Sequence, residues 1–535
     1  MNERSILKNK FYLYLTEFFS GVSVMAVELG ASRLLAPYFS SSQIVWTIII
    51  GTIMIAMALG NLWGGRSADK NPNPDRLYRR ILIAAVWIAA IPVAGKYVIV
   101  AISGALVLTV STNLLMIAAF LSCAVIFVFP LFLLGTVTPS LVKYTVDSLE
   151  DSGKTVGALG AANTIGSIIG TFAPTFVTIP AVGTAITFLI FSGILLVIGL
   201  IYFLSGKTER NACALSLVLF TLCGVFGHSG SFAFWESDLG YEGESIYNYL
   251  QVKDWEDRTI LSTNVLFGVQ SVKMKEAGLT GMYYDYALAG PVMAGLADRK
   301  DAKILILGNG TGTYATQCRT YFPDAAVEGV EIDGKITELA ETYFDLPDTV
   351  NVTTYDGRAY LQAVDTKYDV ILVDAYQDIT IPFQMSSAEF FVEVKNHLTE
   401  GGVMVVNLNL TTDSENGINT ALCDTIASVF DCVCTVDMLE NDNRELFAAS
   451  GVDLSTTLDA NRICQSDSAL RRMMKKVSDH LVIYEAGDQV LTDDRAPVEV
   501  LGMRMLDAYI GRQLDQYRDL FRTGGFSGLL RELDL

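Results

Sequence analysis

Three acidic residues in the second half of the chain, Glu331, Asp356 and Asp374, each follow a short apolar run. A fourth run, residues 304–307, leads directly into a glycine-rich turn at residues 308–312. Glycines at such a place permit a tight turn and let a ligand approach the backbone. Glu331 follows the glycines by about 20 residues, a spacing at which a carboxylate can bind ribose hydroxyls. Because open parallel sheets bind ligands at the carboxyl ends of their strands, the pattern predicts a nucleoside site.

Asp also favours the N-cap of helices, so each of these acids has a purely structural interpretation. A single acid after a strand would favour that interpretation. Three acids in register behind a glycine turn favour the nucleoside site instead.

The apolar runs predict the strands of a Rossmann-like, methyltransferase-type α/β domain, because such runs suit strands buried on both faces. The predicted strands cover residues 304–307, 326–330, 350–354, 370–373 and 403–407. A helix is predicted at 389–398, with Gly401 and Gly402 after it. Upstream, alternation and turn residues over 240–270 predict a small β-sheet, followed by a helix at 286–297.

The first half of the chain has a different composition. Residues 1–230 carry a net charge of +5 and residues 231–535 a net charge of −25, which together make the −20 of the chain. Apolar runs long enough to cross a bilayer lie at about residues 11–36, 44–64, 81–101, 114–138, 157–179, 183–204 and 211–230. We therefore expect a multi-pass α-helical membrane domain of about seven spans.

Basic residues concentrate on the side of the predicted spans that holds the N-terminus. The positive-inside rule then places the N-terminus in the cytoplasm. Seven spans would put the acidic half outside the cytoplasm, and one span more or fewer would reverse that side.

Composition also excludes some kinds of site. The chain has three histidines, His228, His397 and His480, and no CxxC or HxxxH spacing, so we expect no metal centre. The acidic half argues against nucleic acid, which binds basic patches, and it suits a polycationic ligand.

With these features laid out, residues 240–500 resemble the spermidine synthase, or polyamine aminopropyltransferase, family. The resemblance is carried by ESIYNYLQV, the region of Gln270, YYD, ILILGNGTGT, VEID, DGRAYL, YDVILVDAY, EFFVEVKNHLTEGGVMVVN and LTDDRAPVE. The first half is similar to the membrane half fused to such domains in bacteria, in ELGASRLLAPYF, IIGTIMIAMALGNLWGGRSAD, LLGTVTPSL and GSIIGTFAPTFVTIPAVGT.

The resemblance implies transfer of an aminopropyl group from decarboxylated S-adenosylmethionine to a diamine such as putrescine. It implies that Glu331 binds the ribose hydroxyls, that Asp356 binds the adenine amino group and that Asp374 opens the catalytic loop. A carboxylate at Asp374 could accept a proton from the amine and orient it for attack. The expected cofactor-binding residues are Gln270, Gly308, Gly310, Thr311, Gly312, Glu331, Asp356 and Gly357. The expected substrate-binding residues are Tyr283, Asp285, Asp378 and Asp494.

Two departures from the family pattern leave alternatives open. Thr311 stands where the family usually has an Asp that holds the aminopropyl ammonium, and Thr cannot supply that charge. Asp374 and Asp378 are four residues apart, where the family commonly has two acids three apart. A methyltransferase-like enzyme that uses intact S-adenosylmethionine, and a non-catalytic polyamine-binding or transport protein, therefore remain alternatives.

The expected organisation has four parts. They are a transmembrane domain at 1–230, a small β-strand subdomain with a linking helix at 231–298, the Rossmann-like domain at 299–512 and a tail at 513–535. The expected partners are a diamine or polyamine, the lipid bilayer of a bacterial cell membrane and further copies of the chain.

Overall fold

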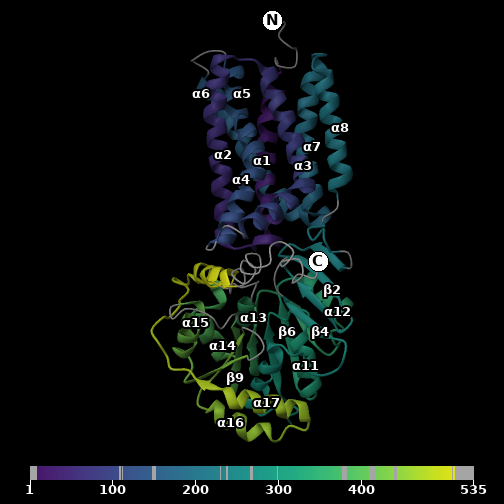
Figure 1. The fold of residues 1–535 in the computed structure, drawn as a ribbon. Coiled ribbons are helices and arrows are strands. Elements are labelled where there is room, and N and C mark those ends of the chain that lie inside the picture. Colours follow the sequence, from purple (N-terminus) through teal and green to yellow (C-terminus); the bar gives the residue numbers. More distant parts are fainter. Residues whose placement is uncertain are drawn as a thin grey trace. The chain divides into compact units, whose positions relative to one another are not determined.

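The computed structural model divides the chain into a helical unit and an α/β unit (Figure 1). The helical unit comprises residues 1–235 and 242–249, and the α/β unit comprises residues 236–241 and 250–535. The chain therefore passes between the units three times, after residues 235, 241 and 249. The structure describes residues 9–107, 110, 113–146, 152–228, 231–236, 239–265, 269–297, 299–375, 382–408, 417–438, 443–508 and 510–512.

Long helices make up the helical unit. They are α1 (Lys10–Phe39), α2 (Gln43–Lys70), α3 (Pro74–Val107), α4 (Leu114–Gly135), α5 (Val137–Thr145), α6 (Ser152–Ala173), a π-helical turn (Pro174–Thr178), α7 (Ile179–Ser205) and α8 (Arg210–Gly227). In the described part of the chain, six segments are long and apolar enough to cross a membrane. These segments support the coarse prediction of a multi-helical apolar region.

The count of six differs from the seven predicted spans at one place. The segment Ser152–Ser205 has 54 residues and covers two of the predicted spans. Its helix is interrupted at Gly183, where φ is 79° and ψ is 171°. Because about 20 helical residues cross a bilayer, this segment is long enough for two crossings joined at Gly183.

Glycines of α6 let the backbone of α1 come close. A Cβ atom at Gly166 would lie 2.0 Å from the carbonyl oxygen of Phe18, and one at Gly170 would lie 2.2 Å from that of Val22. Any side chain at these positions would force the two helices apart. A Cβ at Gly157, on the same helix, would meet no atom of the described residues within 4 Å.

A buried acid joins three helices of this unit. Glu17 of α1 is fully buried, and its Oε1 accepts hydrogen bonds from Thr138 Oγ1 (2.6 Å) and Asn163 Nδ2 (2.8 Å). Thr138 belongs to α5 and Asn163 to α6. The carboxyl group therefore holds side chains of both helices against α1.

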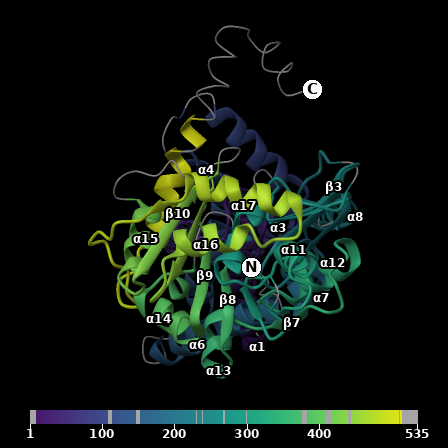
Figure 2. The same ribbon diagram turned by 90° about the horizontal axis from the view of Figure 1, so that it is seen from below.

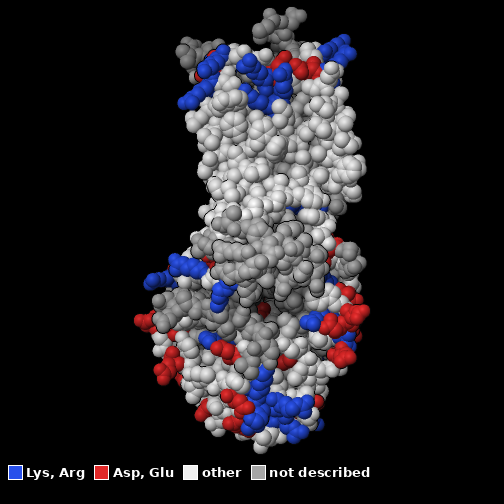
Figure 3. Space-filling model, viewed as in Figure 1, with Lys and Arg blue, Asp and Glu red and all other residues white. Residues whose placement is uncertain are grey.

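The surface of the helical unit separates charge from apolar area. In Figure 3, charged side chains gather at one end of this unit, and a broad uncharged band follows. Ion pairs form near helix ends, between Arg79 and Glu209 (2.6 Å) and between Lys143 and Asp69 (3.0 Å). Exposed side chains of α2 are large and apolar, including Met54, Ile55, Leu59 and Leu62. Such a surface suits a lipid environment.

The α/β unit contains a large sheet and most of a smaller one, because residues 242–244 of β1 and Tyr249 of β2 belong to the helical unit. The smaller has the order β1-β2-β3-β4, from β1 (Leu239–Glu244), β2 (Tyr249–Asp254), β3 (Arg258–Ser262) and β4 (Ser271–Met274). The larger has the order β12-β10-β11-β9-β8-β5-β6-β7. Its strands are β5 (Lys303–Leu307), β6 (Ala326–Glu331), β7 (Asn351–Thr354), β8 (Tyr368–Val373), β9 (Leu398–Leu408), β10 (Cys432–Asp437), β11 (Arg444–Ala449) and β12 (Val482–Ile483). Neighbours from β9 to β7 are parallel, whereas β11 joins β9 and β10 as an antiparallel strand.

Helices cover both faces of the larger sheet (Figure 2). One core contains side chains of α9 (Tyr283–Ala287), α10 (Ala289–Met293), α11 (Thr313–Tyr321), α16 (Leu454–Arg462) and α17 (Ser468–His480). The other contains side chains of α13 (Gly357–Ala363), α14 (Ala388–Asn396) and α15 (Ile418–Ala427). A separate core joins α12 (Gly334–Tyr343) to the smaller sheet. The predicted methyltransferase-type α/β domain is confirmed.

Two predicted elements are wrong in their bounds. The strand expected at residues 403–407 begins earlier, at Leu398, so Gly401 and Gly402 lie within β9 and not between a helix and a strand. The helix expected at residues 286–297 begins earlier, at Tyr283, and is divided into α9 and α10. Met282 has extended backbone angles and the chain turns into the helix directly after it. Tyr283 and Asp285 therefore lie on the first turn of a helix that packs against the sheet.

Candidate nucleoside and amine site

The glycine turn joins β5 to α11 and has left-handed backbone angles at three positions. The φ angles are 89° at Gly308, 53° at Gly310 and 83° at Gly312, which residues with a side chain rarely adopt. A Cβ at Gly308 would lie 2.4 Å from the carbonyl oxygen of Asp374. The absence of a side chain at Gly308 therefore lets the turn lie directly against the residue predicted to be the base.

Glu331 ends β6 beside this turn. Its Oε2 accepts the N–H of Gly310 at 2.9 Å, and its Oε1 accepts the N–H of Asp333 at 3.1 Å. Burial is the main cause that raises the pKa of Glu331 to about 7. The backbone donors oppose this rise, and the nearby Asp333 carboxylate contributes to it. One side chain thus fixes the turn and presents a carboxylate at the sheet edge.

Asp356 has the structural role of a helix N-cap, which was the alternative to a nucleoside contact. It is the N-cap of α13, and its Oδ1 accepts the N–H of Ala359 at 2.9 Å. The side chain is half-buried, and its Oδ2 receives no hydrogen bond from the described residues. Gly357, the first residue of α13, lies next to it. The capping contact therefore leaves one oxygen free for a ligand.

Asp374 follows β8 and lies among buried polar side chains. Its Oδ2 accepts the phenol O–H of Tyr283 at 2.6 Å, and its Oδ1 accepts Asn407 Nδ2 at 3.4 Å. Burial is the main cause that raises the pKa of Asp374 to about 7, and the charge of Glu331 is a smaller cause in the same direction. The two hydrogen bonds stabilise the ionised form and lower the same pKa. A carboxyl group that titrates near neutral pH suits a general base.

The structure brings Tyr283 to Asp374 across 91 residues of sequence. Asp285, two residues further on, is buried and points elsewhere. Its oxygens accept hydrogen bonds from Thr280 N and Oγ1, from Gly281 N and from Gln317 Nε2. These four donors favour a structural role in the turn before α9, and the substrate contact of Asp285 stays a prediction.

The remaining predicted residues differ in their surroundings. Thr311 is buried, and its hydroxyl has no hydrogen-bond partner among the described residues. Gln270 is half-buried, and its carbonyl accepts the O–H of Tyr284 at 3.1 Å. Asp494 is exposed, and Asp378 lies outside the described residues. The ligand contacts of these residues stay predictions.

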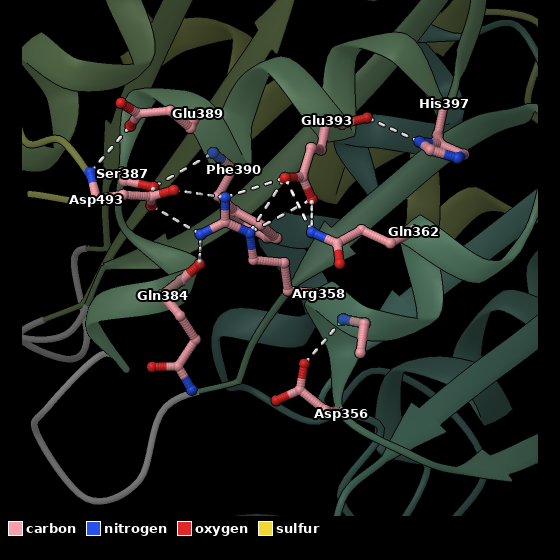
Figure 4. A network of polar contacts seen from close by, with 11 residues as sticks. Asp356, Arg358, Gln362, Gln384, Ser387, Glu389, Phe390, Glu393, His397 and Asp493 are labelled. Carbon is pink, nitrogen blue, oxygen red and sulfur yellow. Dashed lines mark hydrogen bonds and ion pairs between the residues drawn. The ribbon is translucent and has the colours of Figure 1, made fainter.

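Arg358 forms a network that sequence reasoning missed, although it stands in the quoted motif DGRAYL (Figure 4). Its guanidinium donates to Glu393 (3.0 Å), to Asp493 (2.7 and 2.9 Å) and to the carbonyl of Gln384 (3.0 Å). Hydrogen bonding to Asp493, then to Glu393, raises the pKa of Arg358. The network ties the start of α13 to the segment that contains LTDDRAPVE.

Asn407 and Asn443 are also functional candidates that the sequence did not reveal. Asn443 Nδ2 donates to Asn407 Oδ1 at 3.0 Å, which leaves the Asn407 amide nitrogen directed at Asp374. The orientation of the Asn407 amide is therefore set by a second side chain. No group of three metal-ligating side chains occurs in the described ranges.

Together, the glycine turn, the carboxylate at the end of β6 and the half-buried aspartate after β8 define a nucleoside-binding domain of the methyltransferase type. A family model described as the spermine/spermidine synthase domain matches residues 284–438. The probable polyamine aminopropyl transferase of Bifidobacterium longum (strain NCC 2705) is 52% identical over 349 residues, which are 62% of this chain and 77% of that protein. The chain belongs to the polyamine aminopropyltransferase, or spermidine synthase, family, as its motifs predict.

More distant relatives match shorter stretches. The polyamine aminopropyltransferase of Vibrio vulnificus (strain CMCP6) is 31% identical over 184 residues, 33% of this chain and 61% of that protein. The crystal structure of a probable spermidine synthase from Corynebacterium glutamicum ATCC 13032 has a TM-score of 0.36 and 18% identity, and the match covers 47% of this chain and 98% of that one.

Proposed function

We propose that the α/β unit transfers an aminopropyl group from decarboxylated S-adenosylmethionine to a diamine such as putrescine. In this proposal Asp374 is the general base. The observation that carries it is the half-buried Asp374, whose carboxyl group is held by Tyr283 and Asn407 and has a pKa of about 7 beside the glycine turn. Membership of the aminopropyltransferase family supports the same reaction.

The donor nucleoside would lie along the glycine turn and the ends of β6 and β7. Each oxygen of Glu331 accepts one hydrogen bond within the described residues, and a carboxylate can accept about four, so ribose hydroxyls could still donate to it. The Oδ2 of Asp356 could accept the adenine amino group. The buried Thr311 hydroxyl has no partner within the described ranges, so it fits a ligand contact at the turn.

The reaction needs a neutral amine, because a protonated nitrogen has no lone pair with which to attack. The amine N–H bond would break as the proton passes to Asp374, and the nitrogen lone pair would form the new C–N bond. The C–S bond would break at the same carbon, and its electron pair would stay on sulfur and neutralise the sulfonium. Methylthioadenosine would leave uncharged, so the rest of catalysis is the positioning of two ligands.

Thr311 favours a methyltransferase-like enzyme as the competing function. A hydroxyl can accept a hydrogen bond from the aminopropyl ammonium of the donor, but it brings no negative charge. A methyltransferase-like enzyme would bind intact S-adenosylmethionine at the same turn, and a polyamine-binding protein would perform no transfer.

Calorimetric binding separates these functions. The detergent-purified chain is titrated with decarboxylated and with intact S-adenosylmethionine, each with and without putrescine, and methylthioadenosine is assayed in parallel. We expect tighter binding of the decarboxylated form and release of methylthioadenosine with the diamine. Tighter binding of the intact form would support the methyltransferase-like function, and polyamine binding without any methylthioadenosine would support the non-catalytic one.

We further propose that the helical unit anchors the chain in a bacterial cell membrane with the N-terminus in the cytoplasm, and that the chain forms a homo-oligomer. If the chain crosses twice within Ser152–Ser205, the helical unit crosses seven times and the α/β unit lies outside the cytoplasm. Cys464 is an exposed, free cysteine of the α/β unit. A membrane-impermeant maleimide should label it in intact cells and should not label the Cys464→Ser variant at that site.

Labelling of Cys464 only after lysis would place the α/β unit in the cytoplasm. The mass of the detergent-solubilised particle, corrected for bound detergent, tests the oligomer.

A further inference from the structure

Glu445 of β11 is a fully buried acid to which the mechanism above gives no role. Its side chain is 0% exposed, and neither carboxyl oxygen has a hydrogen-bond partner among the described residues. Leaving a buried polar group unpaired costs about 1–3 kcal/mol, and more when the group is charged. Folding alone therefore gives no reason to place an acid at this position.

The other buried acids of the α/β unit are all partnered. Each accepts at least one hydrogen bond within the described ranges: Asp285, Glu331, Asp333, Asp369 and Asp424. Glu445 is the exception among the buried acids that the structure describes in this unit. A buried acid without a partner among the described residues fits a group whose partner is a ligand.

Strand pairing places Glu445 in the site. In the antiparallel pair of β9 and β11, Glu445 is directly opposite Asn407, so the two side chains are on the same face of the sheet. Asn407 is the residue that donates to Asp374. Burial, and then the charge of Asp374, raise the pKa of Glu445 well above its usual range, which indicates that the two carboxyl groups are close enough to interact.

The position of Glu445 matches a need of the amine substrate. A diamine carries two cationic nitrogens at neutral pH, and Asp374 can receive only the one that attacks. Asp285 was predicted to bind the substrate, but it already accepts hydrogen bonds from four protein donors. Asp494, which was also predicted to bind the substrate, is exposed.

We propose that Glu445 determines acceptor specificity by binding an ammonium group of the diamine in the same site as Asp374. This inference rests on the proposed function, since it assigns a residue to the amine side of that reaction. A cation at Glu445 would supply the missing hydrogen-bond donors and would balance the charge of the ionised carboxylate.

The experiment compares wild type with Glu445→Gln and Glu445→Asp in the full-length, detergent-purified chain. Equilibrium binding of putrescine, measured by calorimetry, is the first readout. We expect Glu445→Gln to weaken putrescine binding by about 30-fold or more, because a buried charge partner is lost, and Glu445→Asp to restore part of it. The dissociation constant of decarboxylated S-adenosylmethionine should stay within about twofold, since the glycine turn and Glu331 are unchanged.

Two controls make the outcome decisive. Glu485→Gln removes an exposed acid of the same unit and should leave putrescine binding unchanged. Thermal unfolding of each variant shows whether it is folded. A purely structural acid would give unchanged putrescine binding in Glu445→Gln together with unchanged or higher thermal stability, and this result overturns the inference.

Turnover separates this inference from the proposed function. If wild type binds putrescine at Glu445 but forms no methylthioadenosine, the proposed transfer reaction is contradicted and the proposed amine site is supported. If wild type forms methylthioadenosine and Glu445→Gln leaves the KM for putrescine unchanged, the proposed amine site at Glu445 is contradicted and the proposed reaction is supported. A wild type that does not bind putrescine overturns both.

Discussion

The helical unit and the α/β unit both depend on glycine, but for different physical reasons. In α6, Gly166 and Gly170 have ordinary helical angles and are needed because the α1 backbone lies within about 2 Å of where a Cβ would be. In the turn after β5, Gly308 has a φ of 89° and also lies against Asp374. The first kind of glycine sets the distance between helices, whereas the second sets the shape of a site.

Two hydrogen-bonded acids, one in each unit, differ in the same way. Glu17 of the helical unit accepts hydrogen bonds from two side chains on other helices, which ties the helices together. Asp374 of the α/β unit is also held by two side chains, but at the edge of the parallel sheet where a ligand can reach. Substitutions in the helical unit should therefore change stability, and substitutions at the sheet edge should change chemistry.

The largest effect is expected for Asp374→Asn. The amide cannot accept the proton of the amine, so turnover should fall by about 10²–10⁴-fold, the usual contribution of a general base. Methylthioadenosine release with putrescine measures it. Binding of decarboxylated S-adenosylmethionine should survive, and retained turnover would remove Asp374 from the role of base.

The second-largest effect is expected for Gly308→Ala. The new Cβ would lie 2.4 Å from the carbonyl oxygen of Asp374 and would shift the base, so kcat should fall by about 10²-fold, as for misplacements near 1 Å. The control is Gly451→Ala, where φ is 75° but no described atom lies within 4 Å of the Cβ. If both variants lose activity equally, the loss at Gly308 reflects backbone strain and not the contact with Asp374.

Gly170→Ala tests the helical unit. Its Cβ would lie 2.2 Å from the carbonyl oxygen of Val22, and overpacking of this kind costs about 1–3 kcal/mol of stability. The matched control is Gly157→Ala on the same helix, which has open space and should be neutral or stabilise by up to about 1 kcal/mol. Thermal unfolding in detergent measures both, while kcat of the folded Gly170 variant should remain unchanged. Loss of kcat without loss of stability would contradict the separation of the two units.

The smallest effect is expected for Tyr283→Phe. Asp374 must be ionised to accept a proton, so kcat/KM should rise with pH through about 7 and level off above it. The Tyr283 O–H stabilises the ionised carboxylate and lowers its pKa, so its removal should raise that pKa and move the acid limb to higher pH. At pH 7 the loss should be about twofold to tenfold, typical of one hydrogen bond. A shift to lower pH, or none, would contradict the role of Tyr283.

The parallel strands could be predicted because their residues are buried on both faces and read as continuous apolar runs. Glu331 and Asp374 could be placed at one sheet edge for the same reason, since strand ends of a parallel sheet share an edge. Asp356 was assigned a nucleoside contact, and its observed N-cap role is a second function that the same residue type performs.

Contacts between distant segments could not be predicted in this way. Nothing in the sequence pairs Tyr283 with Asp374 or Arg358 with Asp493, because those contacts depend on how helices pack on the sheet. Glu445 was missed because a single acid at the start of the run ELFAA is typical of a strand end that faces water. Its burial depends on the pairing of β11 with β9, which the local pattern does not encode.

The path of the chain between the units has a consequence for any attempt to separate them. The chain crosses after residues 235, 241 and 249, and the last two crossings lie within and just after the segment Leu239–Tyr249. Truncation at a single point in this region would leave part of one unit attached to the other. A protease cut between residues 235 and 236 would leave residues 242–249 of the helical unit on the fragment that carries the α/β unit. Excision of a water-soluble catalytic fragment therefore requires a redesigned connection that replaces residues 242–249, and a domain swap between relatives should be planned across the whole of residues 236–250.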